Sequence, residues 1–365
     1  MFENIYQGKK VLITGNTGFK GAWLTCWLVK LGANVIGFSK EIPTQPSMYE
    51  SLNLSSSIKH YEGDIRDMES FSKIVSDEKP DVIFHLAAQA IVSQSYKDPS
   101  GTITSNVIGT MNVMEILRKI DWPAVCILIT SDKSYDNVEW EWGYKETDAL
   151  GGKDIYSGSK GSADLIIKSY FNSFIKDNHF VKCAIGRAGN VIGGGDWAQD
   201  RIVVDIVKAW SQNQSVEIRC PEATRPWQHV LEPLSGYLTL GQSLLKEGYN
   251  NGEAFNFGPR AEQNRTVIDL LLSMSDFWTA NIPNDPFKVI DDLPFKEAGL
   301  LKLNCDKALF HLKWDATLDY NKTVKMTADW YSAFYEGNSN MFDVTLDQVD
   351  EYEVIGVKRG SPWTK

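Results

Sequence analysis

The stretch KVLITGNTGFKG at residues 10–21 joins a short apolar strand to a glycine-rich turn, and residues 22–31 continue as a helical run. A strand, a glycine turn and a helix in this order form the unit that binds a dinucleotide pyrophosphate. Gly15 permits the tight turn, Gly18 lets backbone N–H groups approach the pyrophosphate, and Gly21 lets the helix pack on the strand. The glycine spacing is GxxGxxG rather than GxGxxG.

The chain continues as a regular alternation of apolar strands and helical stretches. We predict strands at residues 10–14, 33–38, 58–61, 81–85, 125–130 and 181–186. This period predicts an α/β fold with a Rossmann-type, doubly wound parallel sheet. We expect residues 1–187 to form the cofactor-binding domain, residues 226–258 to return to it, and residues 188–365 to form a smaller C-terminal substrate-binding lobe.

The composition is that of a globular protein with a sizeable core. The chain has 365 residues, of which 43% are hydrophobic and 23% charged, and its formal net charge is −10. An acidic chain is poorly suited to general nucleic-acid binding, so we expect no nucleic-acid partner. We find no apolar run of membrane-spanning length and expect neither a secretory signal nor a membrane partner. Five scattered cysteines predict reduced core thiols in a cytoplasmic protein, and five dispersed histidines suggest no metal site.

The end of the second strand would contact the adenosine ribose. An acidic residue normally binds the ribose hydroxyls here. This chain has Ser39 and Lys40 instead, followed by Glu41, which leaves NAD or NADP open on local chemistry. After the third strand, Asp64 is able to accept from an adenine amino group, since Asp67 is better placed to cap the next helix.

Polar residues follow the central strands where open α/β sheets place their chemistry. Small residues in Leu86–Gln89 leave room for a cofactor against the fourth strand. Ser131, Asp132 and Lys133 follow the next strand with a hydroxyl, an acid and an amine. A solvated ion pair would explain the last two residues equally well if the upstream pattern were absent.

Tyr156 and Lys160 are four residues apart and share one face of a predicted helix. A nearby ammonium group favours the phenolate and lowers the pKa of a tyrosine. Such a phenol can take a proton from a hydroxyl while hydride leaves the carbon beneath it. The pair alone is a weak signal, and its position after a dinucleotide-binding half makes it a candidate catalytic pair.

Two further segments are unusual. The loop at residues 134–153 carries Trp140, Trp142 and Tyr144, which would either shield a ligand from water or pack as a loop or subunit contact. The segment RAGNVIGGGDW at residues 187–197 is dense in glycine and predicts backbone bends around a ligand. We read no chemistry in the polar tail at residues 337–365.

With these residues in view, the chain resembles the extended short-chain dehydrogenase/reductase family. Within it, the chain is similar to nucleotide-sugar 4,6-dehydratases that act on CDP-glucose. The segments that carry this resemblance are TGFKG at 17–21, DI at 64–65, HLAAQ at 85–89, Asn106, TSDKSYDN at 130–137, WGY at 142–144, LGG at 150–152, YSGSK at 156–160, GRAGNVIGGGDW at 186–197 and RPWQHV at 225–230.

The resemblance implies an enzyme that removes water from CDP-glucose by internal redox through bound NAD, giving CDP-4-keto-6-deoxyglucose for deoxysugar and surface-polysaccharide synthesis. The implied catalytic residues are Ser131, Asp132, Lys133, Tyr156 and Lys160. The implied cofactor-binding residues are Gly15, Thr17, Gly18, Phe19, Lys20, Asp64, Ile65, Leu86, Ala87, Ala88, Gln89, Asn106, Tyr156, Lys160 and Arg187. The implied substrate-binding residues are Ser131, Asn190, Arg201, Arg219 and Arg225.

The implied roles divide among the catalytic residues. Tyr156 would remove the O4 proton, Ser131 would hydrogen-bond O4, and Asp132 would protonate the departing 6-hydroxyl. Lys133 stands where related dehydratases carry a glutamate base for C5, and a lysine base has to be neutral. The resemblance further implies a homo-oligomer, a dimer or tetramer, paired through helices at residues 106–120 and 156–174.

Two other functions remain open from the sequence. A nucleotide-sugar 4-epimerase would need Tyr156 and NAD but not Asp132 or Lys133. A dehydratase that acts on another nucleotide-glucose is the other open function, because contacts to the nucleotide base are not legible in the sequence.

Overall fold

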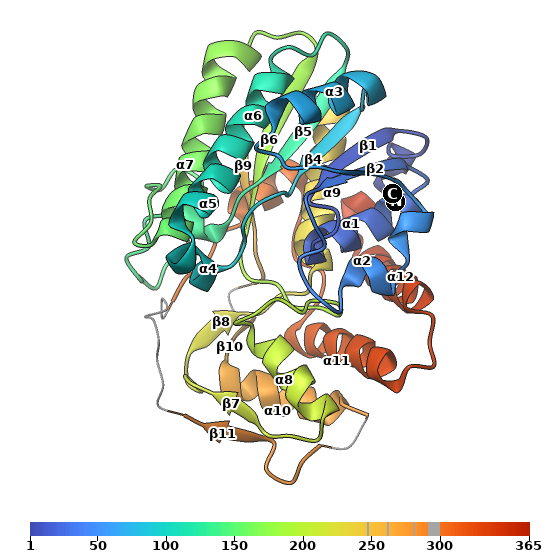
Figure 1. Cartoon of the computed structure of the whole chain (residues 1–365), viewed down its shortest axis with the longest axis vertical. Helices are drawn as coiled ribbons and strands as arrows, with labels where there is room; N and C mark the ends of the chain where they lie inside the picture. Colours follow the sequence, from blue (N-terminus) through green and yellow to red (C-terminus); the bar gives the residue numbers. More distant parts are fainter. Residues whose placement is uncertain (247, 261–262, 280–281, 291–299) are drawn as a thin grey trace.

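The computed structural model describes residues 1–246, 248–260, 263–279, 282–290 and 300–365 (Figure 1). Its centre is a parallel sheet of seven strands in the order β3-β2-β1-β4-β5-β6-β9. These strands are β1 (Lys10–Thr14), β2 (Asn34–Ser39), β3 (Lys59–Glu62), β4 (Val82–His85), β5 (Ala124–Ile129), β6 (Val181–Ala188) and β9 (Ala254–Phe257). The order runs outward in both directions from β1 and β4, so the predicted doubly wound parallel sheet is confirmed.

The register brings the carboxyl ends of the strands to one edge of the sheet. Strand β1 pairs with β4 so that Thr14 lies beside His85, and the Thr14 hydroxyl hydrogen-bonds with His85 Nδ1 at 2.8 Å. All neighbouring strands in this sheet are parallel. The edge with the carboxyl ends faces the smaller lobe in the lower part of the molecule (Figure 1).

Helices cover both faces of the sheet. One face packs against α3 (Met68–Glu78), α6 (Gly109–Leu117) and α7 (Ile155–Tyr170). The other packs against α1 (Phe19–Lys30) and α9 (Leu231–Lys246), and α12 (Met341–Arg359) packs on α1. Side chains of β1 alternate between these layers, because Val11 and Ile13 join one apolar cluster and Leu12 joins the other. Both faces of a parallel sheet are thus buried.

The smaller lobe is built from short strands and three helices. Its strands form a parallel pair, β7 (Val216–Ile218) with β11 (Phe287–Val289), and an antiparallel pair, β8 (Thr224–Pro226) with β10 (Asn264–Thr266). Its helices are α8 (Ile202–Ser211), α10 (Val267–Phe277) and α11 (Tyr320–Glu336). Aromatic rings fill its interior, where Trp197 lies 5.7 Å from Trp330 between ring centroids.

Short helices connect these elements. The short α-helices are α2 (Met48–Ser51), α4 (Val92–Lys97) and α5 (Pro99–Ile103). The 3₁₀-helices are η1 (Phe2–Asn4), η2 (Leu54–Ser56), η4 (Asp132–Ser134) and η8 (Pro362–Thr364). The π-helical turns are η3 (Thr104–Ile108), η5 (Phe171–Ile175) and η7 (Ala308–Leu312).

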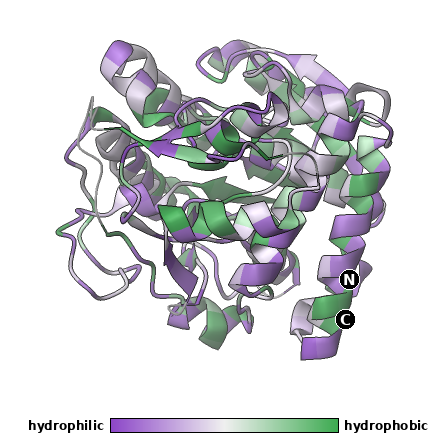
Figure 2. Cartoon of the chain, turned by 90° about the horizontal axis from the view of Figure 1, so that it is seen from below, coloured by the Kyte–Doolittle hydropathy of each residue, from purple (hydrophilic) through white to green (hydrophobic). Residues whose placement is uncertain are grey.

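The C-terminal stretch is a packed helix and not merely a polar tail. Helix α12 buries Val349 and Tyr352 and lies against α1, on the sheet-bearing part of the molecule. Figure 2 shows the two termini side by side, and the backbone N–H of Glu3 donates to the Lys365 carbonyl at 2.6 Å. The predicted domain boundary between residues 187 and 188 stays a prediction. Two later elements lie with the first part of the chain, since β9 belongs to the main sheet and α12 packs on α1.

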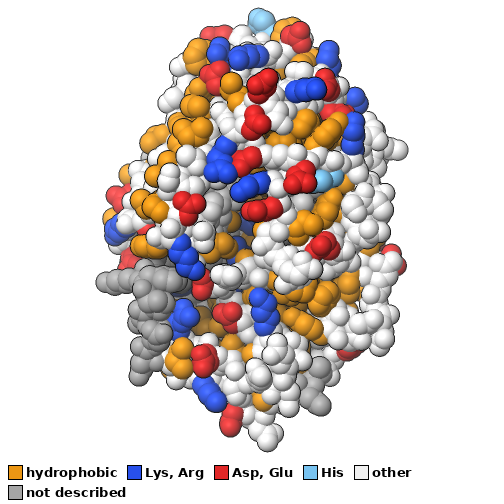
Figure 3. Space-filling model, in the orientation of Figure 1, with side chains coloured by type: hydrophobic (Ala, Val, Ile, Leu, Met, Phe, Trp, Pro, Cys, Tyr) orange, Lys and Arg blue, Asp and Glu red, His pale blue; other side chains and the backbone are white. Residues whose placement is uncertain are grey.

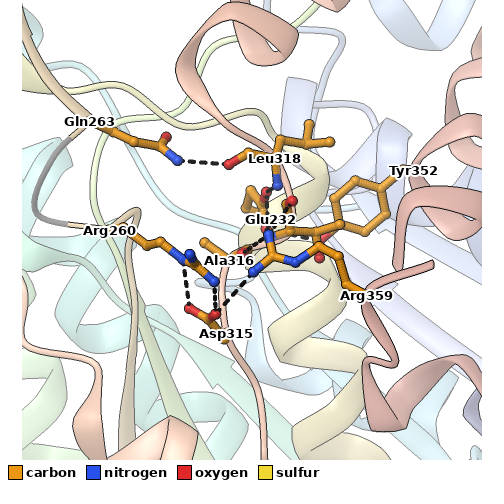
Figure 4. Close-up of polar contacts among 9 residues, drawn as sticks. Glu232, Arg260, Gln263, Asp315, Ala316, Leu318, Tyr352 and Arg359 are labelled. Carbon is orange, nitrogen blue, oxygen red and sulfur yellow. Dashed lines mark hydrogen bonds and ion pairs between the residues drawn. The ribbon is translucent and has the colours of Figure 1, made fainter. Parts of the chain in front are cut away.

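A buried carboxylate joins α9 to the last part of the chain (Figure 4). Glu232 accepts hydrogen bonds from the backbone N–H groups of Thr317 and Leu318 and from the Tyr352 hydroxyl. Arg359 donates to the carbonyl of Ala316 at 2.9 Å. These contacts hold three parts of the chain together, namely α9, α12 and the segment that precedes α11.

The surface carries mixed charges. Lysine, arginine, aspartate and glutamate are interspersed on the face shown in Figure 3, without one basic patch. Within the described ranges, no helix is both long and apolar enough to cross a membrane. The prediction of core thiols is confirmed for Cys26, Cys126 and Cys183, and Cys305 is half-buried. It is wrong for Cys220, which is exposed in the loop after the short strand β7.

Candidate active site

The glycine turn leaves no room for side chains. Gly15 has φ +77°, and a Cβ on it would lie 2.9 Å from the backbone nitrogen of Ala87. A Cβ on Gly21 would lie 2.1 Å from the Gly15 carbonyl oxygen. Gly18 is the N-cap of α1 and offers no side chain to the first N–H groups of the helix. These groups are thus available to an anionic ligand, as the sequence predicts.

The end of β2 is organised by hydroxyl and amide groups. The Ser39 hydroxyl donates to Asn16 Oδ1 at 2.8 Å and accepts from the backbone N–H of Thr17 at 3.3 Å. The Thr17 hydroxyl donates to the Glu41 carbonyl at 2.7 Å. Lys40 is exposed. This network holds the glycine turn against β2 where an acidic residue is absent.

The predicted adenine-binding acid is partnered by an arginine. Both carboxylate oxygens of Asp64 accept from Arg66, with 2.6 Å between Nη2 and Oδ2. Asp67 caps α3 by accepting from the backbone N–H of Ser70, as predicted. Ile65 is buried beside Gly109 of α6. A ligand that contacts the Asp64 carboxylate would therefore also meet the Arg66 guanidinium.

Asn106 ties the end of β4 to the catalytic helix. Its side-chain oxygen accepts from the backbone N–H of Gln89 at 2.8 Å, and its amide nitrogen donates to the Gln89 carbonyl at 3.0 Å. The same nitrogen donates to Ser159 Oγ at 2.9 Å. The half-buried segment at residues 86–89 is thereby held between β4 and α7.

Tyr156 and Lys160 lie on the first turns of α7, as predicted. Asp154 caps this helix by accepting from the backbone N–H of Ser157 at 2.9 Å. Both site residues are buried, and Lys160 Nζ lies 6.0 Å from the centroid of the Tyr156 ring. The helix cap and the burial fix both side chains in one orientation.

Burial dominates the protonation of this pair. It raises the pKa of Tyr156 to about 12, and the negative charge of Asp132 adds to that rise. A hydrogen bond with Ser131 and the charge of Arg201 lower the same pKa. Burial also lowers the pKa of Lys160 to about 8. The expected lowering of the Tyr156 pKa is therefore wrong for this geometry, because burial and the charge of Asp132 outweigh the groups that lower it.

Ser131 and Asp132 meet Tyr156 at the carboxyl end of β5. The Ser131 hydroxyl donates to Asp132 Oδ1 at 2.9 Å, and Ser131 lies close enough to Tyr156 to lower the pKa of its phenol. The other oxygen of Asp132 lies 3.3 Å from the point where Gly189 would carry a Cβ. The hydroxyl, the carboxyl and the phenol thus lie close together at this edge of the sheet.

Lys133 is held only through its backbone. Its N–H donates to Ser131 Oγ at 3.2 Å. Its ammonium group makes no hydrogen bond or ion pair with any residue that the structure describes, and its side chain is half-buried. The sequence predicted Lys133 as a site residue because it directly follows Ser131 and Asp132. In the structure Ser131 and Asp132 are joined by their side chains, whereas Lys133 is joined to Ser131 only by its backbone N–H.

The sequence analysis gave no role to Asp196, which is buried within the glycine-rich segment. Asp196 Oδ2 forms an ion pair with Arg201 Nη1 at 2.9 Å. The charges of Arg201, Asp132, Lys160 and Asp196 all act on Lys20 in α1. The sequence did offer a signal for this residue, because Asp196 directly follows three glycines and stands five residues before Arg201. Lys20 and Arg201 thus belong to the same charged site as Asp132 and Lys160.

Arg187 lies in the core behind the site. Its guanidinium pairs with Asp164 of α7 at 2.7 Å and donates to the Tyr135 hydroxyl, also at 2.7 Å. Both members of the ion pair are fully buried. The structure thus shows Arg187 holding α7 against β6, whereas the sequence predicted contact with a cofactor.

The aromatic loop packs largely on itself. Trp140 stacks on Tyr144, and Tyr144 stacks on Tyr135, with 5.2 Å between ring centroids in each case. Trp142 is 69% exposed. The interpretation of this segment as a packed loop fits Trp140 and Tyr144, whereas Trp142 lies on the surface.

The remaining predicted residues are more dispersed. Asn190 and Arg219 are exposed, and Arg225 is half-buried on β8. Arg225 is paired across the strands with Arg265 of β10. A cavity of about 600 Å³ lies elsewhere, between α10 and α11, and its lining includes three arginines and the acids Asp269, Asp276 and Asp319. It contains none of the predicted site residues.

Comparisons with known proteins agree with this arrangement. The model of the GDP-mannose 4,6 dehydratase family matches residues 12–327. A CDP-glucose 4,6-dehydratase from Salmonella typhimurium is 41% identical over 355 residues, which cover 96% of this chain and 98% of that protein. A CDP-paratose 2-epimerase from Salmonella typhi is 24% identical, covering 89% of this chain and 99% of that protein.

Solved structures share the fold at lower identity. A dTDP-glucose 4,6-dehydratase from Bacillus anthracis in complex with NAD superposes with a TM-score of 0.73 at 18% identity, covering 90% of this chain and 98% of that one. A UDP-glucuronic acid 4-epimerase from Bacillus cereus, in complex with UDP-glucuronic acid and NAD, gives 0.75 at 22% identity, covering 89% and 100%.

Proposed function

Since this chain belongs to the GDP-mannose 4,6 dehydratase family, we propose that it is an NAD-dependent hydro-lyase that converts CDP-glucose to CDP-4-keto-6-deoxyglucose and water. The observation that carries the proposal is the 41% identity to a CDP-glucose 4,6-dehydratase over 96% of the chain. It is supported by the convergence of Tyr156, Ser131 and Asp132 at the carboxyl edge of the sheet.

The residues around the glycine turn fit a dinucleotide. The absence of side chains at Gly15, Gly18 and Gly21 leaves the backbone of the turn and the start of α1 open to a pyrophosphate. The segment at residues 86–89 and Lys160 would hold the nicotinamide half. Bound NAD supplies a hydride acceptor for C4 and a hydride donor for C6.

Tyr156 would take the proton from O4 of the sugar. Ser131 and the positive charge of Arg201 both lower the pKa of Tyr156 and so favour its phenolate, whereas burial raises that pKa. Lys160 would keep a positive charge near the phenolate and near the ribose of the cofactor. Oxidation at C4 leaves a ketone, which makes the neighbouring C5–H acidic.

The three linked groups also account for the departure of water. Asp132, in its protonated form, would protonate the 6-hydroxyl as it leaves. The proton collected from O4 would then return from Tyr156 to Asp132 by way of the Ser131 hydroxyl, which donates to Asp132 Oδ1. No net proton is gained or lost at these three residues over one cycle.

The substrate would lie between the sheet edge and the smaller lobe. Arg201, held by Asp196, and Arg225 on β8 are the proposed partners of its diphosphate, since guanidinium binds phosphate oxygens bidentately. Arg219 and Asn190 are exposed and would contact its outer parts.

We further propose a cytoplasmic homo-oligomer that supplies deoxysugars for surface polysaccharides. Apolar side chains are exposed on the helices that the resemblance implies as the subunit contact or directly beside them, and these are Ile103, Ile108, Leu165 and Phe174. A concentration-independent monomer mass by light scattering would refute the oligomer.

Mass spectrometry of the product, after incubation with CDP-glucose and NAD without a reductant, tests the proposed function. We expect the loss of one water with no net NADH. An unchanged mass with inverted C4 stereochemistry by NMR would identify a 4-epimerase instead. Turnover of dTDP-glucose or GDP-mannose in preference to CDP-glucose would change the nucleotide assignment.

A further inference from the structure

The turn that carries Ser131, Asp132 and Lys133 lies between two side chains with hydroxyl groups. This turn, at residues 131–134, is the 3₁₀-helix η4 with its N-cap, and we call it the site turn. Thr130 directly precedes it and Tyr135 directly follows it. Both side chains are buried, so each hydroxyl needs a partner within the protein.

Both hydroxyls are bonded to one ion pair, which Asp164 and Arg187 form at 2.7 Å. The Thr130 hydroxyl donates to Asp164 Oδ2 at 2.8 Å. Arg187 Nη1 donates to the Tyr135 hydroxyl at 2.7 Å, and that hydroxyl donates to Asn256 Oδ1 at 2.8 Å. The two ends of the site turn are thus attached to the two members of a single, fully buried ion pair.

The same ion pair is attached to the helix that carries the other site residues. Tyr156, Lys160 and Asp164 follow one another in α7 at intervals of four residues, so they lie along one side of the helix. Gly161 lets this helix approach the site turn, because a Cβ on it would lie 3.1 Å from the Ser134 carbonyl oxygen. Asp164 therefore connects α7 to the site turn.

The reaction proposed above needs a fixed distance between two groups on different elements. Tyr156 on α7 would act at O4 of the sugar, and Asp132 on the site turn would act at the hydroxyl on C6. Both must reach one small substrate, and a displacement of about 1 Å can slow such a reaction about 10²-fold. Hydrogen bonds to charged partners are stronger than those between neutral groups, so the bonds to the ion pair are suited to holding the turn.

We propose that the ion pair between Asp164 and Arg187 positions Asp132 relative to Tyr156 by holding both ends of the site turn. This inference rests on the proposed dehydratase function. Asp164 and Arg187 are fully buried, so they act through the turn and not by contact with the sugar. Their effect falls mainly on the loss of water, because Asp132 belongs to the turn and Tyr156 does not.

Variants that each remove one hydroxyl test this role and leave the ion pair itself in place. Tyr135→Phe keeps the ring that stacks on Tyr144, and Thr130→Val keeps the shape of the side chain. Thr130→Ser restores a hydroxyl and should recover what Thr130→Val loses. Tyr6→Phe is the matched control, because the buried Tyr6 hydroxyl donates to the Leu238 carbonyl of α9 at 2.5 Å.

Each variant is mixed with CDP-glucose at saturating NAD. Bound NADH is followed by stopped-flow absorbance, and the loss of water is followed by mass spectrometry after rapid quenching. We expect Tyr135→Phe and Thr130→Val to form NADH within about threefold of the wild-type rate but to release water about tenfold more slowly or worse, so that CDP-4-ketoglucose accumulates. The KM for CDP-glucose should change little, and Tyr6→Phe should leave both steps unchanged. Equal slowing of the two steps, or normal water release in both hydroxyl variants, would overturn the positioning role even if both variants melt at a lower temperature.

Hydrogen exchange, measured by mass spectrometry, tests the attachment of the site turn without a substrate. The backbone N–H of Lys133 donates to Ser131 Oγ, and the N–H groups of Ser134 and Tyr135 donate to carbonyls of the same turn. We expect the peptide that spans these residues to exchange about tenfold faster in Tyr135→Phe and at the wild-type rate in Tyr6→Phe. Equal exchange in the two variants would overturn the attachment. If wild-type protein forms no NADH with CDP-glucose, the proposed function fails, and hydrogen exchange alone decides whether the ion pair holds the turn.

Discussion

Arg187 Nη2 lies 2.7 Å from Asp164 Oδ1, and both side chains are fully buried between β6 and α7. Asp164 also accepts from the Thr130 hydroxyl at 2.8 Å. Asp164 is one helical turn beyond Lys160, and its charge raises the pKa of that lysine. The pair therefore connects the end of β5, strand β6 and the catalytic helix.

Replacing Arg187 by methionine should destabilise the fold, because it leaves the Asp164 carboxylate buried without its partner. We expect the free energy of unfolding to fall by about 3–5 kcal/mol. Denaturant unfolding measures this, with Lys325→Met as the control, since Lys325 forms an exposed ion pair with Asp329. A change below about 1 kcal/mol, with weaker NAD binding, would instead favour the predicted cofactor contact.

A methyl group on Gly21 should damage the glycine turn. Its Cβ would lie 2.1 Å from the Gly15 carbonyl oxygen, so α1 would have to move away from the turn. We expect Gly21→Ala to weaken NAD binding about tenfold or more, measured by fluorescence titration. Gly158→Ala is the matched control, because nothing lies within 4 Å of its Cβ position and alanine favours a helix interior. Equal effects of both changes would contradict the close packing of the turn.

Removal of the Tyr156 hydroxyl should stop the first oxidation. Tyr156→Phe keeps the ring buried but cannot take the O4 proton. We expect at least a 10²-fold slower appearance of bound NADH in stopped-flow absorbance, with CDP-glucose binding preserved. Near-normal NADH formation would exclude Tyr156 as the base at O4.

Asp132→Asn should separate oxidation from the loss of water. The amide keeps the size of the carboxyl group but supplies no acidic proton to the leaving hydroxyl. We expect bound NADH and CDP-4-ketoglucose to accumulate, as measured by absorbance and by mass spectrometry after rapid quenching. Wild-type release of water would remove Asp132 from its acid role.

Glu232 should make the stability of the fold depend on pH. Burial raises its pKa from 4.5 to about 7, despite the backbone N–H groups of Leu318 and Thr317. The folded state thus keeps the proton between pH 4.5 and about 7, where the unfolded state loses it. The stability from Glu232 is complete below pH 4.5 and is lost as pH rises through about 7, a change of about 3 kcal/mol.

Glu232→Gln tests this by removing the titration. The difference in unfolding free energy between the variant and the wild type should shift in favour of the variant by about 3 kcal/mol from pH 4.5 to pH 8. Urea unfolding at several pH values measures how this difference in unfolding free energy changes with pH, and not only its size at one pH. Parallel stability curves for the two proteins would show that Glu232 does not titrate in this window.

The sequence by itself determined the elements whose signals are local. The apolar run before the glycine turn predicts β1, and the four-residue spacing of Tyr156 and Lys160 places both on one face of α7. Ser131 and Asp132 were found because they directly follow a buried strand, and strand ends of a parallel sheet share one edge. Periodicity, turn chemistry and short motifs are properties of neighbouring residues, so they can be read without the fold.

Only the tertiary structure decided which distant residues meet and how strongly each is buried. It paired Arg187 with Asp164, laid α12 against α1, and placed the Glu232 carboxylate against the backbone N–H of Leu318. It also reversed the expected pKa shift of Tyr156, because burial and the charge of Asp132 raise that pKa. Desolvation and contacts across the fold depend on the packing of segments far apart in the chain, and no local pattern encodes them.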